Sequence, residues 1–123
     1  MESGALIAVV DDDPSVRDSL LLLLRNRGFA AHAFASAKEF LASNDLDQTR
    51  CLILDIAMPG MTGIELQQEL VRRGSEIPVV FITASRDDSV RPKVLKRGAV
   101  DCLFKPFSET ALLSAVNTAV GQG

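Results

Sequence analysis

Three consecutive aspartates, Asp11, Asp12 and Asp13, directly follow the apolar run 5–10. Two carboxylates about 4 Å apart repel each other by roughly 1 kcal/mol in water and by roughly 4 kcal/mol near a protein surface. Three acids are not needed to form a turn here, because a single Asp followed by Pro14 would form the turn equally well. Unless the three acids are simply solvated, they therefore indicate a bound cation.

Three other apolar runs also end in a polar side chain that could take part in chemistry: Asp55 after 51–54, Thr83 after 78–82, and Lys105 after 101–104. Clustered carboxylates repel a phosphate group unless a divalent cation lies among them, and Mg²⁺ typically takes one or two carboxylates together with phosphate oxygens and water. One carboxylate can then attack phosphorus as an oxygen nucleophile. Thr83 and Lys105 would supply a hydroxyl and a positive charge for the other phosphoryl oxygens.

Each of these residues has an ordinary structural role when it is considered alone. An Asp at the end of a strand usually belongs to a turn or caps a helix, Thr83 is a common strand residue, and Lys105 would suit any surface. The combination of all four strand ends, in this order, is what predicts phosphoryl chemistry.

The segments between these positions predict alternating strands and helices. Apolar runs predict strands over 5–10, 29–34, 51–54, 78–82 and 101–104, and helical patterns cover 14–27, 37–43, 64–73, 89–97 and 109–120. Such alternation is typical of a parallel sheet covered on both faces. We expect an α/β fold of the flavodoxin-like, doubly wound (βα)5 type, with a five-stranded parallel sheet in the order 2-1-3-4-5. The first and third strands would be neighbours, so their acids would converge at the carboxyl edge.

Several residues mark the expected ends of helices. Pro14 suits the first turn of a helix and Gly28 its end. Ser36 can cap the helix over 37–43, with Glu39 completing a capping box, and Ser108 can cap the last helix.

Composition limits the classes of protein to consider. The 123 residues are 47% hydrophobic and 24% charged, with a net charge of −3 and no Trp or Tyr. We expect one domain over 1–123, and this composition disfavours direct nucleic-acid binding. The sequence shows neither a signal peptide nor an apolar run of about 20 residues, so we expect a cytoplasmic protein with no membrane partner.

The two cysteines and the single histidine do not indicate a separate site. Cys51 and Cys102 would lie on the third and fifth strands, about 10 Å apart, beyond the reach of a disulfide, which ends near 7 Å. Both are expected to be buried small hydrophobic residues. His32, within an apolar stretch, is expected to be structural or at the surface.

Short motifs throughout the chain resemble the receiver domain of two-component response regulators. They are V-V-D-D at 9–12, L-D-I-A-M-P-G at 54–60, T-A at 83–84, G-A at 98–99 and K-P-F at 105–107. The segment R-G-A-V-D-C-L-F-K-P-F is most similar to the FixJ/NarL-type receivers. The resemblance implies a phospho-accepting switch rather than an enzyme. Such a switch takes a phosphoryl group from the phosphohistidine of a sensor histidine kinase and assists its own phosphorylation and dephosphorylation.

The resemblance also implies a role for each site residue. Asp55 would be the phospho-acceptor, Thr83 the switch hydroxyl and Lys105 the partner of the phosphoryl group. The Mg²⁺ ligands would be Asp12 directly, Asp11 largely through water, Asp55, and the backbone carbonyl of Ala57. The Lys105–Pro106 peptide bond would be cis. Asp13 would be either a helix-start acid, which we favour because of the helix dipole, or a third acidic ligand.

Two positions depart from the family pattern. Receivers usually carry Tyr or Phe three residues before the lysine, where this chain has Cys102. Pro92 falls inside the expected fourth helix, so we predict that this helix begins late, near Ser89 or Val90, or is distorted. Either the surface that transmits the signal is unusual, or both changes are neutral.

Three other interpretations compete with this one. A haloacid-dehalogenase-type phosphatase needs a second acid two positions after the nucleophile, where this chain has Ala57. A flavodoxin-like cofactor binder needs a Ser/Thr/Gly loop in place of D-D-D-P. A pseudo-receiver would bind partners without phosphorylation, and Cys102 keeps that alternative open. The resemblance also implies an output domain or transcription regulator as a partner, and a homodimer formed on phosphorylation.

Overall fold

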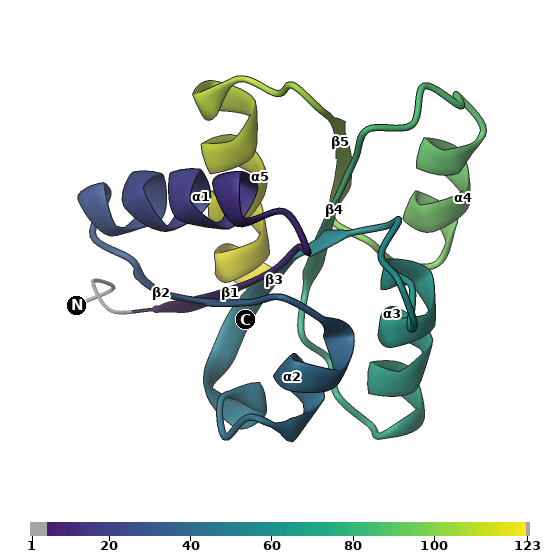
Figure 1. Cartoon of the computed structure of the whole chain (residues 1–123), viewed down its shortest axis with the longest axis horizontal. Helices are drawn as coiled ribbons and strands as arrows, with labels where there is room; N and C mark the ends of the chain where they lie inside the picture. Colours follow the sequence, from purple (N-terminus) through teal and green to yellow (C-terminus); the bar gives the residue numbers. More distant parts are fainter. Residues whose placement is uncertain (1–4, 123) are drawn as a thin grey trace.

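Five parallel strands form one sheet in the order β2-β1-β3-β4-β5, as predicted (Figure 1). The computed structural model describes residues 5–122, so residues 1–4 and 123 of the predicted domain lie outside the described residues. The strands are β1 (Leu6–Val10), β2 (Ala30–Phe34), β3 (Thr49–Asp55), β4 (Val79–Thr83) and β5 (Asp101–Phe104).

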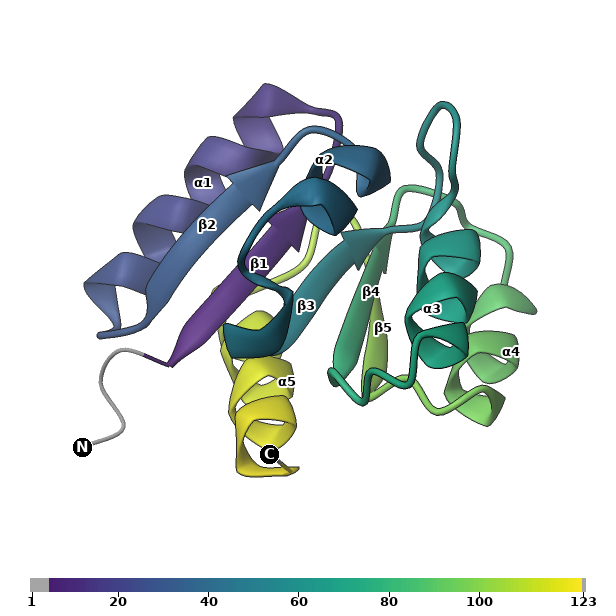
Figure 2. The same cartoon turned by 90° about the horizontal axis from the view of Figure 1, so that it is seen from below.

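Helices cover both faces of this sheet (Figures 1 and 2). They are α1 (Pro14–Asn26), α2 (Ala37–Ala42), α3 (Gly63–Arg72), α4 (Val90–Lys96) and α5 (Glu109–Gln122), with a short 3₁₀ helix, η1 (Leu46–Gln48), before β3. One face packs against α1 and α5, and the other packs against α2, α3 and α4. This is the doubly wound arrangement that the alternating pattern predicted.

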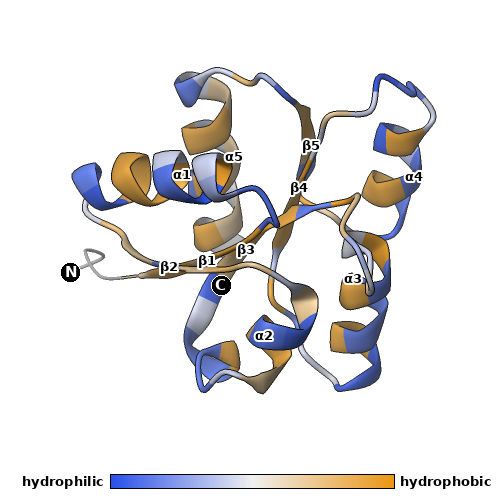
Figure 3. Ribbon diagram, viewed as in Figure 1, coloured by the Kyte–Doolittle hydropathy of each residue, from blue (hydrophilic) through white to orange (hydrophobic). Residues whose placement is uncertain are grey.

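The strands β1 and β4 are buried along their whole length, as is β3 from Cys51 onward, because helices cover both faces of the sheet there, and their side chains are mostly apolar (Figure 3). In β1, Ile7 and Val9 belong to the core under α1 and α5, whereas Ala8 and Val10 belong to the core under the other three helices. The same alternation divides β3 and β4. Burial of each aliphatic side chain contributes about 1.5–3 kcal/mol to the stability of the fold. The two cores therefore fix the positions of the strands, and with them the sheet edge at which the polar residues lie.

The ends of the helices follow most of the predicted signals. Asp13 is the N-cap of α1, and its carboxylate accepts from the Ser15 amide at 2.9 Å. Ser36 caps α2 by accepting from the Glu39 amide at 3.1 Å. The predicted reciprocal bond differs, because the Glu39 carboxylate accepts from the amide of Ala35, one residue before the cap. A complete capping box occurs instead at α3, where the sequence analysis did not predict one.

Helix α4 begins at Val90 and places Pro92 in its first turn, as predicted. A proline there removes no helical hydrogen bond, because the first amides of a helix have no partner within it. The first turn is fixed to β5 by an ion pair between Arg91 and Asp101 at 2.8 Å. The late start of α4 therefore accommodates Pro92 without the loss of a helical hydrogen bond.

Both cysteines are buried and free, as expected. Cys51 lies in the core under α1 and α5, and Cys102 lies in the opposite core, so the sheet itself separates them. His32 is exposed and its Nδ1 lies 2.7 Å from the Asp45 carboxylate. Among the described residues, no helix has the length and apolarity needed to cross a membrane.

Candidate functional site

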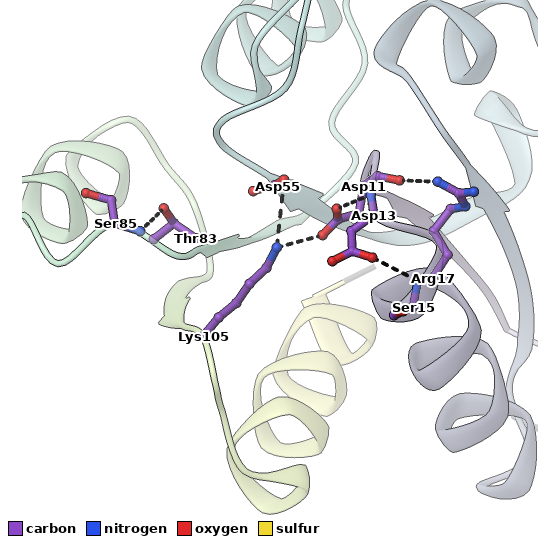
Figure 4. Close-up of polar contacts among 8 residues, drawn as sticks. All are labelled: Asp11, Asp13, Ser15, Arg17, Asp55, Thr83, Ser85 and Lys105. Atoms are coloured by element: carbon purple, nitrogen blue, oxygen red, sulfur yellow. Dashed lines mark hydrogen bonds and ion pairs between the residues drawn. The ribbon is translucent and has the colours of Figure 1, made fainter.

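The predicted site residues lie at the carboxyl edge of the sheet (Figure 4). Asp11 directly follows β1, Asp55 ends β3, Thr83 ends β4 and Lys105 directly follows β5. The carboxylates of Asp11, Asp12 and Asp55 each have an oxygen within 4.8 Å of the others. The convergence of acids expected from neighbouring first and third strands is therefore present.

Strand alternation determines which of these side chains meet. Asp11, Asp55 and Lys105 each lie two residues after a side chain of the core under α1 and α5, so they continue that face. The Lys105 Nζ donates to Asp11 Oδ2 at 3.0 Å and lies 3.8 Å from Asp55 Oδ2. One lysine, which directly follows the edge strand β5, thus connects the acid that follows β1 with the acid that ends β3.

Thr83 belongs to the opposite face of the sheet, because it lies two residues after Phe81 in the other core. Its Oγ1 accepts a hydrogen bond from the Ser85 amide at 3.0 Å, and its backbone carbonyl accepts from the Lys105 amide at 2.8 Å. The structure therefore positions Thr83 at the correct edge of the sheet without joining its hydroxyl to the acid cluster.

Asp55 is buried and has an unusual protonation equilibrium. Burial and the neighbouring Asp11 carboxylate together raise its pKa from 3.8 to about 6, although Lys105 and a hydrogen bond with the Ala57 backbone lower it. A group with this pKa is mostly ionised near pH 7 and protonates in mild acid. The negative charge of this carboxylate is therefore costly unless a cation lies nearby.

The two acids of the β1–α1 turn differ in their surroundings. Asp11 is fully buried, and both of its carboxylate oxygens are engaged, Oδ1 by the Asp13 amide at 2.9 Å and Oδ2 by Lys105. Asp12 is exposed beside it. Asp13 caps α1 and is not a member of the acid cluster, so its role as a helix-start acid is confirmed.

The donor set fits a hard divalent cation. All of the clustered ligand atoms are carboxylate oxygens, which are the ligands that Mg²⁺ and Ca²⁺ take in proteins. Asp12 and Asp55 retain carboxylate oxygens that could serve as ligands, whereas both carboxylate oxygens of Asp11 already accept a hydrogen bond. The peptide bond between Lys105 and Pro106 is cis, as expected.

Several residues of the site were not found by sequence reasoning. Gly63 begins α3 so close to the third strand that an added Cβ would lie 2.3 Å from the Asp55 carbonyl oxygen. Thr62 and Glu65 form the capping box that fixes this end of α3. The T-G-I-E pattern was the available signal for the cap, but the close approach of Gly63 depends on tertiary packing.

Arg17 was also missed, although its guanidinium Nη1 donates to the Asp11 backbone carbonyl at 2.8 Å (Figure 4). Its position in the first turn after the acidic segment was the only signal in the sequence. A helical residue at that distance can face the turn that precedes it, but it can equally face solvent.

A groove of about 510 Å³ adjoins the acid cluster, because Lys105 lines both. Its other lining residues come from α1, from the β5–α5 connection and from the start of α5, namely Val16, Ser19, Leu20, Leu23, Pro106, Phe107 and Glu109. A larger hollow of about 770 Å³ lies at the opposite end of the sheet and contains none of the predicted site residues.

Curated relatives are similar to this chain in sequence over nearly its whole length. The chain is 45% identical over 115 residues to nodulation protein W of Bradyrhizobium diazoefficiens, covering 94% of this chain and 51% of that protein. It is 42% identical over 121 residues to response regulator protein TmoT of Ectopseudomonas mendocina, covering 97% and 54%. The chain thus spans about half the length of these curated relatives.

Solved structures agree with these relatives. Response regulator StyR has a TM-score of 0.89 and 45% identity, covering 95% of this chain and 59% of that one. A structure described as FixJ-N has a TM-score of 0.85 and 35% identity, covering 96% and 94%. The response regulator receiver domain family matches residues 7–117. This chain therefore belongs to the receiver domain family of two-component response regulators.

Proposed function

We propose that Asp55 accepts a phosphoryl group from the phosphohistidine of a sensor histidine kinase in a Mg²⁺-dependent reaction. The observation that carries this proposal is the meeting of Asp11, Asp12 and Lys105 at a buried Asp55 whose pKa is raised to about 6. Membership of the receiver family supports it. We further propose that residues 1–123 form one receiver domain that works in the cytoplasm.

The proposed transfer exchanges one bond to phosphorus for another. An oxygen of the Asp55 carboxylate attacks phosphorus, the phosphorus–nitrogen bond of the phosphohistidine breaks, and the imidazole nitrogen keeps the electron pair. Lys105 neutralises one of the phosphoryl oxygens from its position between Asp11 and Asp55. The acyl phosphate is later hydrolysed by water, and we propose that the same residues assist that step.

Four residues would hold Mg²⁺ in this account: Asp12 and Asp55 by their side chains, Ala57 by its backbone carbonyl, and Asp11 largely through water. When bound, the ion would neutralise charge between the acids and the incoming phosphoryl group. Asp11 contributes by fixing the turn and by orienting Lys105, to which it is bonded at 3.0 Å.

We propose that Thr83 is the residue through which the phosphoryl group changes the conformation. Its Oγ1 accepts from Ser85 but retains a hydroxyl hydrogen that could donate to a phosphoryl oxygen. Moving Thr83 toward Asp55 would displace the β4–α4 segment that its hydroxyl now anchors. This displacement would act on an output domain or a transcription regulator, and could support a homodimer formed on phosphorylation.

The groove beside Lys105 is the place where we expect the kinase to dock. It is lined mainly by apolar residues, and it leads directly to the acid cluster. Ser19→Lys changes an exposed residue that lines the groove, and Leu22→Lys makes the same change at an α1 residue that is 65% exposed and outside it. Phosphotransfer from autophosphorylated sensor kinases should slow in Ser19→Lys alone, whereas phosphorylation by acetyl phosphate, which needs no kinase, should be unchanged in both variants.

The experiment that tests the proposed function is intact-mass spectrometry after incubation with acetyl phosphate. The native protein and Asp55→Asn are compared with and without Mg²⁺. We expect the native protein to gain one phosphoryl group only when Mg²⁺ is present, and Asp55→Asn to gain none. An unmodified native protein under every condition would overturn the proposal and favour a pseudo-receiver that binds partners without phosphorylation.

A further inference from the structure

Two arginines of α1 donate hydrogen bonds to backbone carbonyls, one just beyond the end of β1 and one within β2. Arg17 Nη1 lies 2.8 Å from the Asp11 carbonyl oxygen, and Arg25 Nη2 lies 2.6 Å from that of Ala31. The two contacts are chemically alike, but they lie at opposite ends of the helix. Only the contact of Arg17 is made to a residue of the acid cluster.

Asp11 is held by contacts from several directions. Its amide donates to the Phe34 carbonyl at 3.2 Å, which ties it to β2. Its carboxylate accepts from the Asp13 amide and from Lys105. Because β1 ends at Val10, the Asp11 carbonyl has left the regular ladder, and the guanidinium of Arg17 supplies its hydrogen-bond donor (Figure 4).

We propose that Arg17 is a positioning residue for the cation site, which holds the β1–α1 turn so that Asp11 and Asp12 face Asp55. The Asp11 carbonyl belongs to the peptide unit that leads into Asp12, so a donor fixed at that carbonyl restricts the orientation of the next residue. The inference rests on the proposed function, since it concerns the same Mg²⁺ site.

An electrostatic role and a positioning role of Arg17 predict opposite changes in Mg²⁺ affinity when the residue is replaced. A guanidinium near a cation site repels the ion, so a purely electrostatic role means that removing its charge tightens Mg²⁺ binding. A positioning role means that removing it weakens binding, because the carboxylates lose their arrangement. Residues that orient metal ligands typically contribute about 10–100-fold in metal affinity. The direction of the change therefore separates the two roles.

The test measures binding of Mg²⁺ alone to the unphosphorylated protein by isothermal titration calorimetry. Arg17→Gln should weaken binding by about 10-fold, and Arg17→Lys should restore part of the loss because it keeps a charged donor on the same stem. Arg25→Gln removes the corresponding bond at the far end of α1. This control should bind Mg²⁺ as the native protein does.

A second readout needs no metal. The Asp13 amide donates to Asp11 Oδ1 at 2.9 Å, so its hydrogen exchange reports on the order of the turn. In metal-free protein, exchange at this amide should accelerate in Arg17→Gln and remain unchanged in Arg25→Gln. Equal acceleration in both variants would overturn the inference, because it would reflect a general loosening of α1.

Other outcomes of the titration also decide the question. Unchanged or tighter Mg²⁺ binding in Arg17→Gln, with normal binding by the native protein, would overturn this inference and leave the proposed function intact. A native protein that does not bind Mg²⁺ would overturn the proposed function and this inference together.

Discussion

At the scale of single residues, the ionised form of Asp55 is costly to the folded protein. Its pKa of about 6 lies above the ordinary value of 3.8, because the side chain is buried and faces Asp11. Folding therefore favours the protonated carboxyl. The stabilisation that this provides is complete below about pH 3.8 and is lost as the pH rises through about 6.

Asp55→Asn should accordingly stabilise the metal-free protein above pH 6. The difference between the two pKa values corresponds to about 3 kcal/mol at most. We therefore expect the free energy of unfolding to increase by on the order of 2 kcal/mol at pH 7.5 and to change little at pH 4. Urea unfolding of both proteins at the two pH values, with a chelator present, measures this difference. An equal effect at both pH values would contradict the raised pKa.

Lys105 lowers the pKa of Asp55, and Lys105→Met should therefore raise that pKa further above 6. The side chain of Met fills much of the same volume without the charge. Carbon-13 NMR of the Asp55 carboxyl across a pH titration measures the shift directly. Lys93→Met, at an exposed lysine of α4, is the matched control and should leave this titration unchanged.

The sequence predicted which residues come together at the site better than it predicted how they are held. Asp11, Asp55 and Lys105 were placed correctly because parallel strands bring their carboxyl ends to one edge. Asp12 joined the cluster as expected. The contact of Arg17 with the Asp11 carbonyl could not be foreseen, since it depends on the distance of α1 from the sheet.

At the scale of elements, the start of α3 packs directly against the strand that carries Asp55. The Gly63 amide donates to the Ile56 carbonyl at 2.9 Å, and an added Cβ would meet the Asp55 carbonyl oxygen at 2.3 Å. Both contacts involve backbone atoms, so neither can be relieved by the rotation of a flexible side chain. This end of α3 therefore tolerates only glycine.

Gly63→Ala should destabilise the domain by about 1–3 kcal/mol, because overpacking forces a shift of the backbone. The same shift should slow phosphorylation of Asp55 by acetyl phosphate. Gly121→Ala is the control, since it lies in α5 with no atom near the added Cβ and should not reduce stability. Chemical denaturation of both variants checks the prediction, and equal stability of the two would contradict it.

A substitution at Cys102 tests whether β5 can hold the Tyr or Phe that receivers usually carry at this position. Cys102 is 1% exposed and lies in the same core as Phe81 and Val94 of α4. Cys102→Phe should destabilise the unphosphorylated protein by about 1–3 kcal/mol, because a much larger side chain at a buried position overpacks the core. Cys102→Ala should cost less. A Cys102→Phe variant as stable as the native protein would show that an inward aromatic fits.

The order and the type of the elements were predictable from two signals. Strands buried on both faces are mostly apolar, and capping residues and glycines mark where the helices begin and end. The late start of α4 followed from Pro92 alone. The 3₁₀ helix over Leu46–Gln48 and the earlier start of β3 at Thr49 were missed, because this polar segment carries no periodic pattern. The Thr49 hydroxyl bonds back to Asp45, a local contact that hydropathy does not reveal.

At the scale of the whole molecule, a cation that binds only the folded state should stabilise the entire domain. At a Mg²⁺ concentration about ten times the dissociation constant, the gain is about 1.4 kcal/mol, or an increase of roughly 4–8 °C in Tm for a domain of about this size. Thermal denaturation with and without a chelator measures it. Asp12→Asn should reduce the effect.

Asp47→Asn is the matched control for this thermal experiment. Asp47 is an exposed acid that lines the hollow at the opposite end of the sheet, so its removal changes the net charge equally without touching the cluster. An equal loss of the Mg²⁺ effect in both variants would indicate a response to net charge rather than a site.

The central claim is that Asp55 itself carries the phosphoryl group, and peptide mapping tests this most directly. Borohydride reduces an aspartyl phosphate to homoserine, which marks the modified position in a mass spectrum. After reaction with acetyl phosphate and Mg²⁺, the account predicts homoserine at position 55 and an unmodified Asp at positions 11, 12 and 13. A mark at one of those three positions, with Asp55 intact, would contradict it.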